Sequence, residues 1–334
     1  MSETVVAPTR RALVWRLWLP VIAAAVVGMG ALGWGFGLWP APRFIEYPML
    51  VKTDIPTAIA TGSDGIWFTI EFSDAIGVFR DGKIDRLPKS SQNLEPLGLA
   101  ADGAGGAWYT DTPARAISRI SSDGSIRSFP LSTPIIRLGR LAVAPDGAVW
   151  FADVTTASVM QLKDGVFIRH ELGLPGATPY GIAIDPSGTV WTTLQGADQL
   201  GWISADGQLT AIDVPTRNSV LSDITTDRYG AVWFLELRAN KIGRLAEGRF
   251  TEFAVPTPSA GLTGLAAAPD GSVWFTELSV GRLGRLRGDH VTEFPLPRQK
   301  SRPFGVAVDA ANNVWYTDLA GWLGMLPASA AKAP

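Results

Sequence analysis

The chain has 334 residues, of which 46% are hydrophobic and 18% are charged, so it is long enough to bury a large core and too apolar to be disordered. The first 42 residues carry three arginines and one glutamate, which leaves 26 basic and 30 acidic residues in the rest. That weakly acidic balance argues against nucleic acid as a partner, because a nucleic-acid-binding surface needs a positive field. The absence of cysteine excludes disulfides and thiolate sites.

The first predicted element is a membrane anchor. Residues 17–39 form an uncharged, apolar run of the length that crosses a bilayer as a helix. Three arginines precede this run, so the positive-inside rule places residues 1–16 in the cytoplasm and the rest of the chain on the periplasmic or extracellular side. The nearest candidate for a cleavage site ends at Ala41 and is followed by Pro42, which favours an uncleaved anchor over a secretory signal. We therefore expect a single-pass protein of the cell membrane.

Beyond the anchor, the sequence repeats itself. Seven tryptophans in matching contexts follow one another at intervals of 41 or 42 residues: Trp67, Trp108, Trp150, Trp191, Trp233, Trp274 and Trp315. Six of them follow a glycine-containing turn, as in residues 146–150 (DGAVW), and short apolar runs with a second glycine turn complete most repeats. Four short strands with glycine turns in about 40 residues are typical of one β-propeller blade. The sequence therefore predicts an all-β fold, a seven-bladed β-propeller of four-stranded blades, over residues 43–326.

The last repeat stops at Leu326 after three strands, so its fourth strand is predicted at the other end of the domain. Residues 43–48 match the outer strand of the preceding repeat, residues 292–295 (TEFP). Pairing of this segment with the last repeat would close the ring and remove the open edges that invite aggregation. Residues 327–334 are predicted to be a disordered tail.

The repeat text is similar to a known family. Residues 230–236 (GAVWFLE), 240–245 (NKIGRL) and 179–182 (PYGI) resemble the virginiamycin B (streptogramin) lyases, which are seven-bladed propellers, and the resemblance covers residues 43–326. It implies an enzyme that opens a cyclic depsipeptide by elimination at its ester linkage with a bound Mg²⁺. It also implies a histidine at the start of each of the last two blades, a glutamate just before the second histidine, and a glutamate four residues after the last tryptophan.

Each of those four positions differs in this chain. Thr263 and Phe304 stand where the resemblance implies the two histidines, and Arg302 and Leu319 stand where it implies the two glutamates. None of these side chains supplies a base near neutral pH or an oxygen ligand for a hard cation. We therefore predict no catalytic residue and no metal site, with Mg²⁺ as a cofactor only if lyase activity is retained.

A carboxylate recurs three residues after five of the seven tryptophans. These residues are Asp111, Asp153, Glu236, Glu277 and Asp318. They could form a ring that binds a metal. A residue repeated in five blades more simply belongs to the framework, paired with arginines such as Arg119, Arg244 or Arg285, and this is the favoured interpretation.

Positions that break the repeat predict a ligand site at the axial mouth of the ring. They are Glu95, Arg137, Arg140, Tyr180, Asp223, Thr263, Arg302 and Phe304, and Arg298 and Lys300 stand on the nearby connection between blades 6 and 7. Guanidinium groups bind oxyanions bidentately, which suits a carboxylate, phosphate or glycan ligand. The alternative is a solvated rim whose arginines pair with nearby acidic residues. The two histidines, His170 and His290, are expected far from the axis.

The favoured function is a membrane-anchored, extracytoplasmic propeller that binds a ligand or protein without lyase chemistry. Its partner would be an anionic small molecule, a glycan or an envelope protein. Two alternatives stay open, namely a diverged lyase or lactonase-type hydrolase acting on a cyclic ester, and a structural subunit of an envelope complex. Turnover of a cyclic depsipeptide or lactone would identify the enzyme, and copurification would identify the complex.

Overall fold

The computed structural model describes residues 43–89, 91–92, 96–132, 137–173, 177–204 and 207–331. No helix within these residues is long and apolar enough to cross a membrane. The predicted cytoplasmic segment, residues 1–16, and the predicted anchor, residues 17–39, lie outside the described residues.

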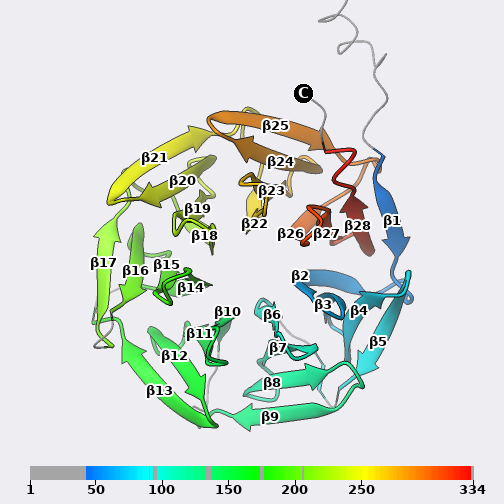
Figure 1. Cartoon of the computed structure of the whole chain (residues 1–334), viewed down its shortest axis with the longest axis horizontal. Helices are drawn as coiled ribbons and strands as arrows, with labels where there is room; N and C mark the ends of the chain where they lie inside the picture. The colour runs from blue at the N-terminus through cyan, green and yellow to red at the C-terminus, as the bar shows by residue number, and fades with distance from the viewer. Residues whose placement is uncertain are drawn as a thin grey trace, which may run out of the picture. The chain divides into compact units, whose positions relative to one another are not determined.

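The described residues form seven four-stranded antiparallel sheets arranged as blades around an axis, which confirms the predicted propeller (Figure 1). Blade 1 contains β2 (Ile55–Gly62), β3 (Gly65–Glu71), β4 (Ala75–Arg80) and β5 (Lys83–Pro88). Blade 2 contains β6 (Leu99–Ala101), β7 (Gly106–Asp111), β8 (Ala116–Ser121) and β9 (Ile126–Pro130). Blade 3 contains β10 (Leu138–Val143), β11 (Val149–Asp153), β12 (Ser158–Lys163) and β13 (Val166–Glu171).

The remaining blades follow the same order from the innermost to the outermost strand. Blade 4 contains β14 (Pro179–Ile184), β15 (Val190–Leu194), β16 (Gln199–Ile203) and β17 (Leu209–Asp213). Blade 5 contains β18 (Leu221–Thr226), β19 (Val232–Glu236), β20 (Lys241–Ala246) and β21 (Arg249–Ala254). Blade 6 contains β22 (Leu262–Ala267), β23 (Val273–Glu277), β24 (Arg282–Arg287) and β25 (His290–Pro295). Blade 7 contains β26 (Pro303–Val308), β27 (Val314–Asp318), β28 (Trp322–Leu326) and β1 (Ile45–Pro48).

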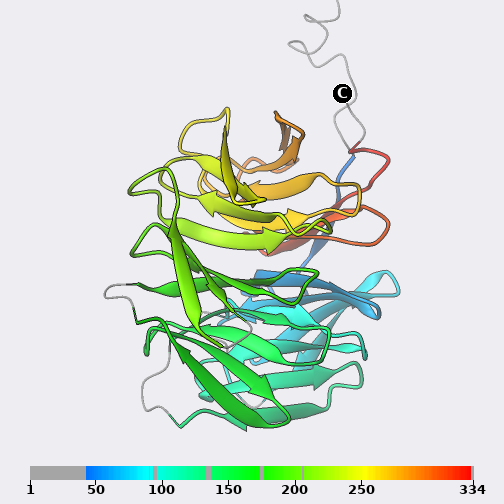
Figure 2. The same ribbon diagram turned by 60° about the vertical axis from the view of Figure 1, so that its left-hand side comes forward.

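The first strand of the domain closes the ring, as the sequence predicts. β1 pairs antiparallel with β28, with Ile45 opposite Met325 and Pro48 opposite Trp322. Figure 2 shows β1 in blue beside the red strands of the last blade. The Glu46 carboxylate anchors the strand, because it accepts hydrogen bonds from Tyr316 Oη (2.7 Å) and from Arg298 Nη2 (3.0 Å).

Two interactions explain the repeated sequence text. The indole N–H of a blade tryptophan donates to an aspartate of the preceding turn, as from Trp233 to Asp227 (2.9 Å). The aromatic residue after the tryptophan lies across a glycine of the third strand, and a Cβ on Gly243 would come 2.1 Å from the Phe234 ring. The glycine of the NKIGRL segment is therefore required by packing. The blade tryptophans also pack between blades, since Trp315 of blade 7 contacts Phe79 of blade 1 at 5.1 Å between ring centroids.

The C-terminal segment differs from the prediction of a disordered tail. Residues 327–331 form a turn in which the Ala331 N–H donates to the Pro327 carbonyl (3.0 Å). Ala331 is buried in an apolar cluster with Trp274 and Leu326, and its carbonyl accepts a hydrogen bond from the Arg285 guanidinium. The prediction was wrong for residues 327–331 because packing and a satisfied carbonyl hold them on the last blades, while residues 332–334 lie outside the described residues.

Two faces of the ring result from the antiparallel strand order. Each innermost strand begins, and each second strand ends, on the face that also carries the connections between blades, such as residues 296–302 between β25 and β26. We call it the connection face. The opposite face carries the Asp-Gly turns, such as Asp146-Gly147, and we call it the turn face.

Candidate functional site

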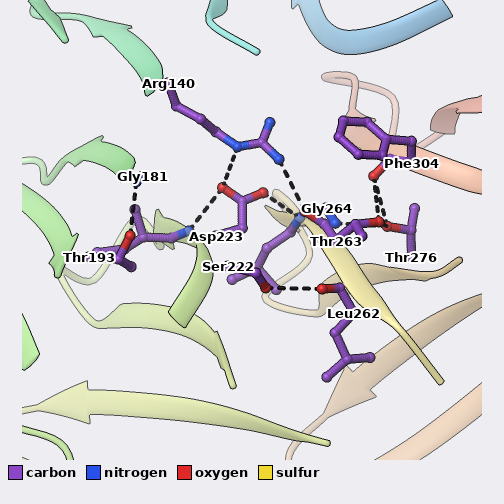
Figure 3. A network of polar contacts seen from close by, with 12 residues as sticks. Arg140, Gly181, Thr193, Ser222, Asp223, Leu262, Thr263, Gly264, Thr276 and Phe304 are labelled. Carbon is purple, nitrogen blue, oxygen red and sulfur yellow. Dashed lines mark hydrogen bonds and ion pairs between the residues drawn. The ribbon is translucent and has the colours of Figure 1, made fainter. Parts of the chain in front are cut away.

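Seven of the eight predicted site residues lie where the innermost strands begin, on the connection face. Arg140, Tyr180, Asp223, Thr263 and Phe304 belong to the innermost strands of blades 3 to 7, and Arg137 and Arg302 directly precede two of these strands. Glu95 lies outside the described residues. The structure brings Arg140, Asp223 and Thr263 together, and Thr263 also contacts the backbone of Phe304 (Figure 3).

A β-bulge shapes the start of most innermost strands. In four blades a glycine at the bulge donates its N–H to a threonine Oγ1 of the second strand, as from Gly264 to Thr276 (2.8 Å) and from Gly181 to Thr193 (2.8 Å). Blade 1 has alanine at this position, and Ala58 N–H donates to Thr69 Oγ1 (3.0 Å). The bulge leaves little room, because a Cβ on Gly264 would come 2.6 Å from the carbonyl oxygen of Phe304 in the next blade.

Blades 3 and 5 lack both the small residue at the bulge and the threonine in the second strand. Arg140 and Asp223 replace the small residue of the bulge, while Ala152 and Leu235 replace the threonine. The Arg140 Nε lies 3.0 Å from Asp223 Oδ1, although blade 4 stands between their strands around the ring. The two departures therefore compensate one another with an ion pair.

Two backbone N–H groups bind the Asp223 carboxylate in addition to Arg140. Its Oδ1 accepts a hydrogen bond from the Ile224 N–H (3.0 Å), and its Oδ2 accepts one from the Leu265 N–H of blade 6 (3.0 Å). The side chain is only 7% exposed, and burial raises the pKa of Asp223 despite the opposing effect of the Arg140 guanidinium. Arg140 Nη2 also donates to the Thr263 carbonyl (3.0 Å). These contacts link blades 3, 5 and 6 and occupy the polar groups, as the paired-rim alternative expects.

Thr263 and Phe304 also form hydrogen bonds with neighbouring residues. The Thr263 Oγ1 lies 3.0 Å from the Phe304 carbonyl oxygen and 2.9 Å from Thr276 Oγ1 (Figure 3). The side chains of Phe304 and Tyr180 are half-buried. Arg137 is exposed, and its N–H donates to Thr155 Oγ1 (2.7 Å).

Positive charge without an ion-pair partner among the described residues lies instead between blades 6 and 7. A cavity of about 620 Å³ is lined by residues 278–282, 295–296 and 298–302, which include four cations and no acidic residue. Arg282 pairs with Glu293, and Arg298 pairs with Asp318 (2.8 Å). Lys300 and Arg302 are exposed and form no ion pair with a described residue. The sequence predicted Arg302 as a site residue and named Lys300 on the adjoining connection, and both residues line this groove.

The polypeptide around Arg302 is fixed from both sides. The Arg302 N–H donates to Asp318 Oδ1 (3.0 Å), and the Arg302 carbonyl accepts from the Leu319 N–H (3.0 Å). The preceding residue, Ser301, has a buried hydroxyl with no hydrogen-bond partner among the described residues. Arg302 thus lines the groove from a backbone that hydrogen bonds hold on blade 7.

These residues do not fit a Mg²⁺ ion. The positions that would hold or serve the metal carry a guanidinium at Arg302, a phenyl ring at Phe304 and an isobutyl group at Leu319. Mg²⁺ takes oxygen ligands in octahedral geometry, which such side chains cannot supply. Within the part of the chain that the structure describes, no three acidic, histidine or cysteine side chains come together as a metal cluster.

The recurrent carboxylates do not share one kind of partner among the described residues. Asp111 forms a buried ion pair with Lys89 (3.0 Å). The expected arginine partners were wrong: Arg119 binds Asp102 (2.6 Å), Arg244 lies over the Trp233 ring, and Arg285 binds a carbonyl.

Two of these carboxylates are buried close to a second glutamate. Burial and the neighbouring Glu293 raise the pKa of Glu277 to about 8, and burial and Glu252 raise the pKa of Glu236 to about 7. Neither carboxylate oxygen of Glu277 has a hydrogen-bond partner among the described residues. These two glutamates are therefore protonated in a substantial fraction of molecules near neutral pH.

Comparison with known proteins agrees with the resemblance in the repeat. The sequence profile of the virginiamycin B lyase family matches residues 40–164 and 137–328. A virginiamycin B lyase of Nocardia farcinica is 31% identical over 182 residues, which are 54% of this chain and 62% of that relative. The alignment thus spans less than two thirds of the relative's length.

Solved structures extend the similarity to the whole ring. A selenomethionine-substituted virginiamycin B lyase from Staphylococcus aureus is 28% identical, with a TM-score of 0.80 over 85% of this chain and 98% of that one. A catalytically inactive variant of the Staphylococcus aureus lyase, solved with quinupristin, is 27% identical with the same TM-score and the same coverage. A streptogramin B lyase structure at 24% identity has a TM-score of 0.81 over 86% of this chain and 98% of that one, which shows the shared fold.

Proposed function

This chain belongs to the virginiamycin B lyase family, and from that premise we propose that it binds an anionic ligand between blades 6 and 7 without the lyase reaction. The observation that carries the proposal is that Lys300 and Arg302, which form no ion pair with any described residue, line a groove with no acidic side chain among its lining residues. A guanidinium residue and an ammonium residue that line one groove, with no acidic side chain among the lining residues, favour a carboxylate or phosphate group.

The groove also suggests the shape of the ligand. Leu278, Val280, Pro295 and Leu296 form apolar lining beside the cations. A volume of about 620 Å³ lies within the range of about 300–1,000 Å³ that is typical of small-molecule sites. A small molecule or peptide end with one acidic group and an apolar part matches this lining.

The lyase reaction is unsupported because its chemical groups are replaced. An elimination needs a base that removes a proton and a group that stabilises the developing negative charge. Thr263, Phe304 and Leu319 supply neither, and the Thr263 hydroxyl is already bonded to blade 7. Groups that act together in catalysis lose nearly the whole rate enhancement when they are removed together.

Two assays on the purified full-length protein test the proposal. Quinupristin should remain intact in the presence of Mg²⁺, as followed by chromatography, and Mg²⁺-dependent turnover would overturn the non-lyase part. Titration with citrate, as a simple anionic probe, should show salt-sensitive binding that Lys300→Ala/Arg302→Ala weakens at least tenfold. Lys83→Ala, which removes a lysine that is 69% exposed in blade 1, should leave binding unchanged. Equal citrate binding in all three proteins would exclude the groove.

We also propose that residues 17–39 anchor the propeller to the cell membrane on its extracytoplasmic side. The support is the uncharged run behind three arginines. The protein should stay with membranes after an alkaline carbonate wash, and protease added outside spheroplasts should degrade the propeller. A protein released from membranes with a new N-terminus near residue 42 would contradict this proposal.

A further inference from the structure

A second cavity lies on the turn face, between blades 3 and 4, far from the groove of the proposed function. It has a volume of about 350 Å³. Trp150, Gln161 and His170 line it from blade 3, and Ser187, Thr189 and Ser204 line it from blade 4. No acidic or basic side chain other than the imidazole is among its lining residues.

His170 breaks the repeat at this cavity. The outer strand of four other blades places a phenylalanine or tyrosine against the blade tryptophan, in the pairs Trp108–Phe129, Trp233–Phe253, Trp274–Phe294 and Trp315–Tyr47. In blade 3 an imidazole takes this position, with 5.1 Å between the ring centroids of Trp150 and His170. The imidazole still stacks on the tryptophan, and its ring nitrogens add polar atoms at this position.

The second ring nitrogen of His170, Nε2, has no hydrogen-bond partner within the described part of the chain. His170 Nδ1 lies 2.9 Å from the Gly207 carbonyl oxygen, which can only accept, so Nδ1 carries the proton. In the neutral ring, Nε2 is then an acceptor. It is buried and has no hydrogen-bond partner among the described residues, which is an unfavourable arrangement unless a bound group donates to it.

Other polar groups at the cavity are also unused. In blades 1, 4, 5 and 7 the tryptophan indole binds an aspartate, whereas Asp146 of blade 3 binds Lys163 Nζ (2.7 Å). Neither the Trp150 indole N–H nor the Gln161 carboxamide forms a hydrogen bond with another described residue. Blade 3 therefore presents two donor groups and two acceptors, counting both ends of the carboxamide.

Blade 4 completes the lining with fixed hydroxyl groups. Ser187 Oγ donates to Asp185 Oδ1 (2.6 Å) and lies 2.9 Å from Thr189 Oγ1. Ser204 Oγ donates to the Gln208 carbonyl (2.8 Å). Since the Ser187 hydroxyl proton is engaged inside the blade, the Ser187 oxygen interacts with further groups as an acceptor.

We infer that this cavity binds a neutral saccharide unit. Its lining combines uncharged donors and acceptors with aromatic rings, which matches a ligand that has several hydroxyl groups and an apolar C–H face and carries no charge. A ligand hydroxyl that donates to His170 Nε2 would satisfy the buried acceptor. The volume lies at the lower end of small-molecule sites, which suits one sugar ring.

The test is saturation-transfer NMR of the full-length protein with methyl α-glucoside, methyl α-mannoside, methyl β-galactoside and N-acetylglucosamine as probes. At least one probe should bind, and its addition should shift the imidazole resonance that disappears in His170→Phe. His170→Phe restores the aromatic residue of the other blades and should keep the fold while weakening binding at least tenfold. Gln161→Leu should weaken binding similarly, and His290→Phe, which removes the other and exposed histidine, should not.

Three results would overturn the inference. One is the absence of binding by every probe to the wild-type protein. Another is equal binding by His170→Phe at an unchanged melting temperature. The third is binding of citrate at the His170 resonance in preference to the sugars, which would show an anion site in place of a saccharide site. The groove variant Lys300→Ala/Arg302→Ala should retain sugar binding, so the experiments can reject the saccharide site and the anion groove independently.

Discussion

Arg140 of blade 3 and Asp223 of blade 5 form a buried ion pair across the mouth of the ring, with 3.0 Å between Nε and Oδ1. Both residues stand at positions where the other blades have glycine or alanine, and in both blades the second strand lacks the threonine that bonds to this position elsewhere. In place of two hydrogen bonds from a bulge N–H to a threonine hydroxyl, these blades share one ion pair between residues far apart in the sequence. It links blades that do not contact one another as neighbours in the ring.

The first prediction concerns this pair. Asp223→Ala or Arg140→Ala should each lower the free energy of unfolding by about 3–5 kcal/mol, because each leaves a buried charge without its partner. The double variant should lose clearly less than the sum, as measured by urea unfolding. The exposed pair Arg217–Asp213 is a control, expected to contribute at most about 1 kcal/mol. Additive losses for Arg140 and Asp223 would contradict the coupling.

The sequence identified the charged residues of the mouth but not their pairing. Arg140 and Asp223 stood out because they interrupt a repeat, yet several arginines and acids share that region and no local spacing selects among them. A further signal was present: Ala152 and Leu235 replace threonine in the same two blades. The groove at Lys300 and Arg302 was only partly predictable, because it depends on which neighbouring arginines are neutralised by Glu46, Glu293 and Asp318.

The second prediction concerns ring closure. Glu46→Gln should lower the free energy of unfolding by about 1–3 kcal/mol, since it weakens the charge-assisted bonds to Arg298 and Tyr316 that hold β1 on blade 7. Tyr316→Phe should cost less in the Glu46→Gln background than in the wild type. Chemical denaturation measures both effects, and equal costs in the two backgrounds would show that the hydroxyl does not act through Glu46.

Deleting residues 43–50 tests the closing strand as a whole. The deletion leaves β28 with an unpaired edge, so the protein should aggregate or unfold at a lower temperature. Light scattering and a thermal melt measure the two outcomes. A melting temperature equal to that of the intact chain would show that the ring does not need this strand.

The third prediction separates two roles of glycine. Gly243→Ala should destabilise by more than about 3 kcal/mol, because the new Cβ would overlap the Phe234 ring in a packed interior. Gly248→Ala should cost about 1 kcal/mol, since its φ of +73° is strained for alanine although the space around it is open. Gly103→Ala meets no atom within 4 Å and should be neutral or slightly stabilising. The order of the three melting temperatures checks the argument.

The fold was far more predictable than the site because the sequence pattern of a blade occurs seven times. Regular spacing of the tryptophans fixed the number of blades, and the missing strand of the last repeat pointed to residues 43–48. The C-terminal segment could not be predicted in the same way. Ala331 is buried because it packs on an apolar surface of blades 6 and 7 and because Arg285 donates to its carbonyl. The short sequence of residues 327–334 does not indicate either contact.

The last prediction concerns pH and the buried Glu277. Burial and the nearby Glu293 raise the pKa of Glu277 to about 8 from an ordinary value of 4.5, so the folded state favours the protonated carboxyl. Its contribution to stability is greatest below pH 4.5 and is lost as pH rises to about 8. Between pH 6 and pH 9 the free energy of unfolding should fall by about 2–3 kcal/mol from this group alone.

Glu277→Gln should remove that part of the fall, because the amide keeps the shape and does not ionise. Urea unfolding at pH 6, 7, 8 and 9 measures it, with Glu171→Gln as the control for an exposed carboxylate. Glu236, with a pKa raised to about 7, adds a decline at lower pH that Glu236→Gln should remove. If Glu277→Gln and the wild type lose stability equally between pH 6 and pH 9, the carboxyl of Glu277 is not the group that titrates.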